Sequence, residues 1–69
     1  MQSFQIYEMA TGEILIDREF ADAEAAGKKR RSLQGKLGRD LGMIRVIDPA
    51  TDGAHIVRMV RRYREEVLA

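Results

Sequence analysis

Basic side chains form two clusters in this 69-residue chain, and clustered arginine and lysine residues can bind phosphate groups. The first cluster is the run Lys28-Lys29-Arg30-Arg31, and the second surrounds Tyr63 near the end of the sequence. A guanidinium group makes two-pronged contacts with phosphate, and an exposed tyrosine ring can stack on a base. We therefore predict a nucleic-acid-binding surface that consists of Lys28, Lys29, Arg31, Arg58, Arg61, Arg62 and Tyr63.

Charge is distributed unevenly along the sequence. Residues 1–26 contain six acidic residues and one base, a net charge of −5, whereas residues 27–69 contain eleven bases and five acids, a net charge of +6. One interpretation is that the two halves attract each other in the fold, which would leave the basic side chains as a solvated, ion-paired surface. The other is that the basic half binds an anionic partner, because such asymmetry is typical of nucleic-acid-binding chains.

No group of residues predicts catalysis or a bound cofactor. His55 is the only histidine and there is no cysteine, so the ligands of a typical zinc site are missing. Ser3 and Ser32 lie in no nucleophile motif, and the glycines at 35 and 38 lack the Lys-Ser/Thr of a phosphate-binding loop. We expect a non-enzymatic binding module that uses neither a metal nor a small-molecule cofactor.

The elements that must position the basic residues follow from the periodicity of apolar side chains. Residues 3–9 alternate apolar and polar side chains and predict a strand, and residues 13–18 predict a second strand. Residues 22–37 predict a helix, because an aspartate can cap its first turn and Gly38 can end it in the left-handed conformation. Residues 43–48 predict a third strand.

The C-terminal third of the sequence has two interpretations. The segment around residues 44–57 aligns with the first hairpin and repeats its Ala-Thr-Gly turn with one inserted residue. This repeat predicts a fourth strand at residues 54–60 and the order β-β-α-β-β plus a short C-terminal helix from Arg62, which we favour. Alternatively, the apolar residues 56, 59, 60, 63 and 67 form one helical stripe and Pro49 suits a first helical turn, which predicts β-β-α-β-α with a long C-terminal helix.

Both interpretations give one small α+β domain over residues 1–69, with the helix at 22–37 covering one face of an antiparallel sheet. The core expected beneath Leu33 and Leu37 consists of Phe4, Ile6, Ile14, Ile16, Ile44 and Val46. The other sheet face would carry further apolar side chains, and such surfaces are typical of protein interfaces. The alternative function is therefore a homodimeric protein-interaction or structural accessory, with a dimer interface formed by Tyr7, Leu15, Ile47, Val57 and Met59.

Two resemblances concern the arrangement of elements. The segment RVIDPATDGAHIVRMVRRYREEVLA resembles the C-terminal part of FlaG-type flagellar proteins, which have a strand, an acidic residue, a Thr-Gly turn, a second strand and a closing Glu-Glu-x-Leu. The matching residues are Val46, Asp48, Thr51, Gly53, Ile56, Val57, Arg58, Glu65, Glu66 and Leu68. The resemblance implies a C-terminal hairpin. The overall order is loosely similar to the DNA-binding domains of phage-type integrases, which place three strands before the helix rather than two. Neither resemblance transfers a function.

The sequence also bears on location. No apolar run approaches the roughly 20 residues of a membrane span, and residues 1–9 lack the pattern of a signal peptide. We therefore expect a cytoplasmic protein that has no membrane partner.

Overall fold

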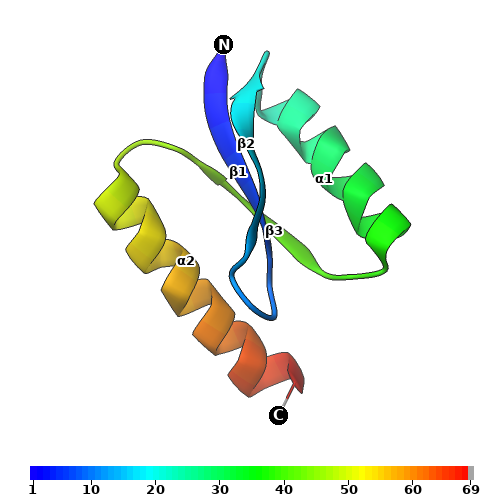
Figure 1. The fold of residues 1–69 in the computed structure, drawn as a ribbon, viewed down its shortest axis with the longest axis vertical. Helices are drawn as coiled ribbons and strands as arrows, with labels where there is room; N and C mark the ends of the chain where they lie inside the picture. Colours follow the sequence, from blue (N-terminus) through cyan, green and yellow to red (C-terminus); the bar gives the residue numbers. More distant parts are fainter. Residues whose placement is uncertain (69) are drawn as a thin grey trace.

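Three antiparallel strands and two long helices make up the fold in the computed structural model, which describes residues 1–68 (Figure 1). The elements are β1 (Gln2–Glu8), β2 (Ile14–Phe20), α1 (Ala23–Leu37), β3 (Leu41–Arg45) and α2 (Pro49–Tyr63), and α2 continues into a π-helical segment (Arg64–Leu68). The sheet order is β2-β1-β3, so β1 is the central strand. The two helices cover opposite faces of the sheet (Figure 1).

The long α2 confirms the β-β-α-β-α alternative, and the favoured fourth strand at residues 54–60 is wrong. Asp48 caps α2, because its carboxylate accepts hydrogen bonds from Ala50 N at 3.2 Å and Thr51 Oγ1 at 3.1 Å. Pro49 occupies the first turn, where helical N–H groups have no partner within the helix. The segment that repeats the hairpin turn is therefore the start of a helix, and the hairpin implied by the flagellar resemblance is wrong for the same reason.

The helix predicted at residues 22–37 is confirmed as α1 to within one residue, and both of its ends behave as its sequence indicates. Asp22 caps it by accepting a hydrogen bond from Ala25 N at 2.8 Å. Gly38 ends it with a φ of +65°, and its N–H donates to the Gln34 carbonyl at 2.9 Å. The next strand, β3, begins three residues later at Leu41.

The main core lies between α1 and the sheet. It consists of Phe4, Ile6, Phe20, Ala26 and Leu41. Ile6 is completely buried at the centre of β1, and the rings of Phe4 and Phe20 meet edge to face with centroids 6.1 Å apart. Burial of these side chains is the main stabilising term that holds α1 on the sheet.

A bulge in β2 changes which face two of its side chains occupy. Ile6 pairs with Ile16 whereas the next residue, Tyr7, pairs with Ile14, so Leu15 is an extra residue in β2. Leu15 consequently packs against the α1 side of the sheet. Ile14 turns to the opposite face, where it is 41% exposed. The sequence-based placement of Ile14 in the core and Leu15 on the other face is therefore wrong.

The face assignment of β3 is also corrected. Met43 lies opposite Ile6 and packs against the core, so Ile44 and Val46 belong to the second face rather than to the α1 side. A shift of one residue turns every side chain of a strand to the other face of the sheet. The prediction for β3 was shifted in this way, so all of its side chains were assigned to the wrong face. At the end of α1, Leu37 is 43% exposed and covers less of the sheet than its spacing predicts.

Gly42 provides a test of the second face, where it lies directly against the buried ring of Tyr7. A Cβ atom at residue 42 would lie 2.5 Å from Tyr7 Cζ and 2.8 Å from Met9 Sδ. We expect Gly42→Ala to lower the free energy of unfolding by about 1–3 kcal/mol, because the tyrosine must move. Gly35→Ala is the control, since no heavy atom lies within 4 Å of its added Cβ. It should raise helix stability by up to about 1 kcal/mol. Equal effects of both substitutions in chemical denaturation would contradict this packing.

Candidate functional site

The outward surface of α2 gathers three of the predicted basic residues. Arg58, Arg61 and Arg62 are all exposed, and they line a shallow depression of about 420 Å³ together with His55, Met59 and Glu65. Residues three and four apart are neighbours on a helical surface, so the spacing of these arginines brings their guanidinium groups to one place. We call Arg58, Arg61 and Arg62 the α2 arginine face.

Acidic side chains offset part of this charge. Arg62 Nε donates to Glu66 Oε1 at 3.4 Å, and both side chains are more than half exposed. An exposed ion pair of this kind contributes little and exchanges readily with solvent or another anion. The α2 arginine face therefore keeps a positive charge that an incoming phosphate can engage.

The basic residues of α1 lie elsewhere. Lys28, Lys29 and Arg31 are exposed on the outer side of α1, whereas Arg30 turns inward and donates to Gln34 Oε1 at 3.0 Å. Because α1 and α2 lie on opposite sides of the sheet, their outer surfaces face away from each other (Figure 1). Each of the two basic clusters of the sequence therefore lies on its own helix, and the two clusters do not form one surface.

Tyr63 makes a hydrogen bond within the domain. Its hydroxyl donates to Asp40 Oδ2 at 2.6 Å, which connects the end of α2 to the segment between α1 and β3. The hydrogen bond to the Asp40 carboxylate raises the pKa of Tyr63, with desolvation and the negative charges of Asp40 and Glu8 acting in the same direction. The ring would have to leave this hydrogen bond to stack on a base.

Three further contacts hold α2 in place, and sequence reasoning did not identify them. The buried Asp52 carboxylate accepts a hydrogen bond from Ile47 N at 2.8 Å. Arg64 Nε donates to the Ala10 carbonyl at 2.9 Å. Ile56 and Val60 pack beside Gly12, where an added Cβ would lie 3.3 Å from Val60 Cγ2. The contacts at Ala10 and Gly12 have no local sequence pattern, because they depend on how the hairpin and the helix meet in space. The Asp52 contact spans five residues at the start of α2, and its local sign is an acidic residue in the first helical turn.

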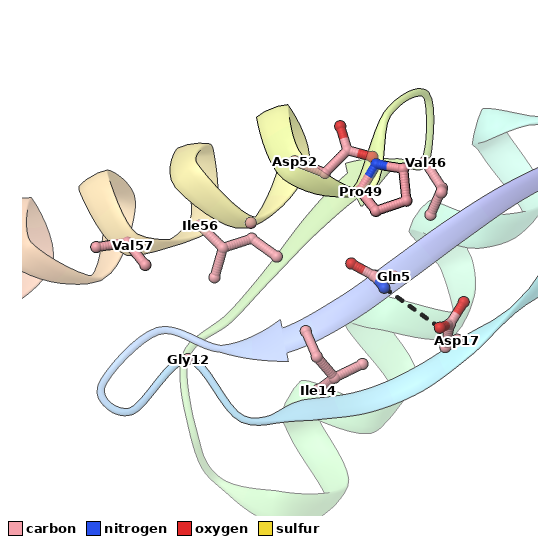
Figure 2. Close-up of a pocket in the computed structure, with 10 residues that line it drawn as sticks. Gln5, Gly12, Ile14, Asp17, Val46, Pro49, Asp52, Ile56 and Val57 are labelled. Atoms are coloured by element: carbon pink, nitrogen blue, oxygen red, sulfur yellow. Dashed lines mark hydrogen bonds between the residues drawn. The ribbon is translucent and has the colours of Figure 1, made fainter.

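A groove of about 520 Å³ separates the N-terminal half of α2 from the second face of β1 and β2 (Figure 2). Ile14 and Asp17 of β2 and Gln5 of β1 lie on the sheet side, where Gln5 Nε2 donates to Asp17 Oδ2 at 3.2 Å. Ile56 and Val57 lie on the helix side, and Val57 is 58% exposed. α2 therefore covers the second sheet face only in part.

The five residues predicted for a dimer interface are distributed over several environments. Tyr7 is 2% exposed within the single chain, Leu15 packs in the main core and Met59 is half-buried. Ile47 is 79% exposed, and Val57 lines the groove. Dimerisation stays a prediction, and the exposed apolar surface it would use is that of Ile47, Val57 and Ile14. Ile14 was missed because nothing in the sequence reveals the bulge.

The molecule is thus a small α+β domain of β-β-α-β-α order with two surface features on α2, an arginine face and a groove. Within residues 1–68, no group of histidine, aspartate and glutamate side chains is arranged to hold a metal ion. No helix in the same part of the chain is long and apolar enough to cross a membrane. No protein-family model, curated protein or solved structure matches this chain.

The two tyrosines give a pH-dependent test of how α2 and Tyr7 are packed. The pKa of Tyr63 is raised above 10.0 by its hydrogen bond to Asp40, and that of Tyr7 is raised by burial. Each group therefore contributes stability that is fully present below pH 10.0 and is lost as the pH rises through the folded-state pKa. Ultraviolet absorbance should show phenolate forming at higher pH in the folded protein than in guanidinium. Tyr63→Phe should remove half of the signal and leave a raised pKa for Tyr7. Coincident folded and unfolded titrations would contradict both contacts.

Proposed function

We propose that this chain is a small non-enzymatic module that binds nucleic acid through the α2 arginine face. The observation that carries the proposal is the convergence of Arg58, Arg61 and Arg62 on one exposed depression of a single helix. Guanidinium groups suit phosphate because their planar donors match its oxygen atoms in pairs. The proposal includes a cytoplasmic location, where nucleic acid is accessible.

Three arginines limit both the affinity and the sequence specificity of this surface. Three arginines contact about three phosphates, so the logarithm of the affinity should fall with the logarithm of salt concentration with a slope of about −3 on duplex DNA. Contacts to phosphate position a protein on nucleic acid but do not read base sequence. We therefore expect binding that is weak at physiological salt, strong only at low salt, and insensitive to sequence.

The test compares two triple variants that remove the same charge. Arg58→Ala/Arg61→Ala/Arg62→Ala should lower affinity for a short duplex at low salt by about tenfold or more and flatten the salt dependence. Lys28→Ala/Lys29→Ala/Arg31→Ala removes three charges from the opposite side of the molecule and should retain most of the binding. Fluorescence anisotropy of a labelled duplex measures both.

Two results would overturn the proposal. One is the absence of binding by the unmodified protein at low salt. The other is an equal loss of affinity in both triple variants, because that would show attraction to overall charge rather than to the α2 arginine face. Circular dichroism of each variant shows whether the fold is retained.

A second candidate function is a homodimeric protein-interaction or structural accessory that uses the second sheet face. The observation that favours it is the open groove, in which Ile14 and Val57 remain exposed on opposite walls. Apolar side chains gathered around a concave surface are typical of interfaces.

A further inference from the structure

The sheet ends in two edge strands, β2 and β3, and the helices cap both ends of β3 but no part of β2. Leu41 N, at the start of β3, donates to Gln34 Oε1 at 3.1 Å. Ile47 N, just beyond the end of β3, donates to Asp52 Oδ2 at 2.8 Å. Among residues 1–68, no hydrogen bond from a helix or a loop reaches the backbone of β2. β2 is therefore an open edge, to which an extended chain can add as a further strand.

Two residues of β2 have backbone groups that point out of this edge. Consecutive residues of a central antiparallel strand bond alternately to the strands on its two sides. Val46 N donates to the Ser3 carbonyl at 2.9 Å, so β1 bonds toward β3 at its odd-numbered residues and toward β2 at its even-numbered ones. Arg18 pairs with an even-numbered residue of β1 and thus bonds inward. The N–H and C=O groups of its neighbours Asp17 and Glu19 therefore point away from the sheet.

The side chains of Asp17 and Glu19 place two negative charges on the second sheet face beside the open edge. Both side chains are exposed, and within residues 1–68 neither of them makes a salt bridge. Asp17 accepts a hydrogen bond from the neutral amide of Gln5 at 3.2 Å. Arg18 points to the α1 side, where its guanidinium carbon lies 4.1 Å from the centre of the Phe20 ring. The two carboxylates can therefore pair with cations from outside the chain.

An apolar site lies at the other end of the same face of β2. Ile14 is 41% exposed there and lines the groove together with Val57, which is 58% exposed (Figure 2). The charged residues among those that line the groove are Asp17 and Asp52, which are both acidic. A ligand that follows β2 on this face therefore meets two acidic side chains and then an apolar surface.

These charges disfavour a second copy of the chain and nucleic acid at the open edge. The symmetric antiparallel register that pairs all of Ile14–Phe20 with itself is centred on Asp17. It sets two Asp17 carboxylates opposite each other, and like charges in that position destabilise a strand pair. The same carboxylates repel phosphate. A basic segment instead gains from both carboxylates.

We propose that the outer edge of β2 binds an extended segment of another protein that carries basic side chains two residues apart. The segment adds a fourth strand, and its backbone bonds with the outward groups of Asp17 and Glu19. Its basic side chains lie opposite the two carboxylates, and an apolar side chain beyond them covers Ile14. The inference goes beyond nucleic-acid binding and is independent of it, because it uses β2 rather than the α2 arginine face.

The test uses a capped synthetic peptide that follows this pattern. It has threonine at every odd position and lysine, lysine and valine at its three even positions. Amide chemical shifts of the isotope-labelled protein should change mainly at residues 14–20 as the peptide is added. The amide protons of Asp17 and Glu19 should also exchange more slowly, because they become hydrogen-bonded to the added strand.

Two variants with the same change in charge separate the open edge from overall attraction. Asp17→Lys/Glu19→Lys should weaken binding about tenfold or more, because both cross-strand pairs become repulsive. Glu65→Lys/Glu66→Lys reverses two exposed acids at the end of the chain and should retain most of the binding. A peptide with glutamate in place of both lysines should bind the Asp17→Lys/Glu19→Lys variant better than it binds the unmodified protein. That rescue also shows that the variant keeps its fold.

Four results would overturn the proposal. The first is the absence of shifts in β2 at millimolar peptide, and the second is an equal loss of binding in the two variants. The third is a set of shifts without slower exchange at Asp17 and Glu19, since the peptide would then contact side chains alone. The fourth is self-association of the unmodified protein through β2, which would assign the edge to a second copy. None of these results bears on the α2 arginine face, which is tested with duplex DNA.

Discussion

Both faces of the sheet carry apolar side chains, and the chain has one helix to cover each face. On the first face, Phe4 and Ile6 are sealed by α1 and form the main core. On the second face, Tyr7 is buried but α2 leaves the β2 side open. α2 is held at its C-terminal end by the hydrogen bond of Tyr63 and in its middle by the packing of Ile56 and Val60 beside the hairpin turn. The groove remains because α2 covers the second sheet face less completely than α1 covers the first.

Local signals explain why α1 could be predicted from sequence. Asp22 at its start and Gly38 at its end act within one turn, so their effect does not depend on the rest of the fold. The C-terminal segment was harder, because its similarity to the first hairpin competed with a helical stripe. The decisive local features are Asp48 and Pro49, which together form a helix start.

What the sequence could not supply depends on contacts between elements. The bulge in β2 reverses Ile14 and Leu15, and it follows from how two strands pair rather than from either strand alone. The convergence of Arg58, Arg61 and Arg62 follows from helical spacing, but it could be recognised only once the segment was known to be a helix. The separation of the two basic clusters depends on the helices covering opposite sheet faces, which no local pattern encodes.

In this account α2 has three sides with different tasks: an inner side that covers the sheet, a side that borders the groove, and an outer arginine face. The proposed function places partners on α2 rather than on α1. The most direct measurement is an amide chemical-shift map of the isotope-labelled protein as a short duplex is added at low salt. We expect shifts concentrated at residues 55–62 and little change at residues 28–36. Shifts confined to α1, or spread evenly over both helices, would contradict it.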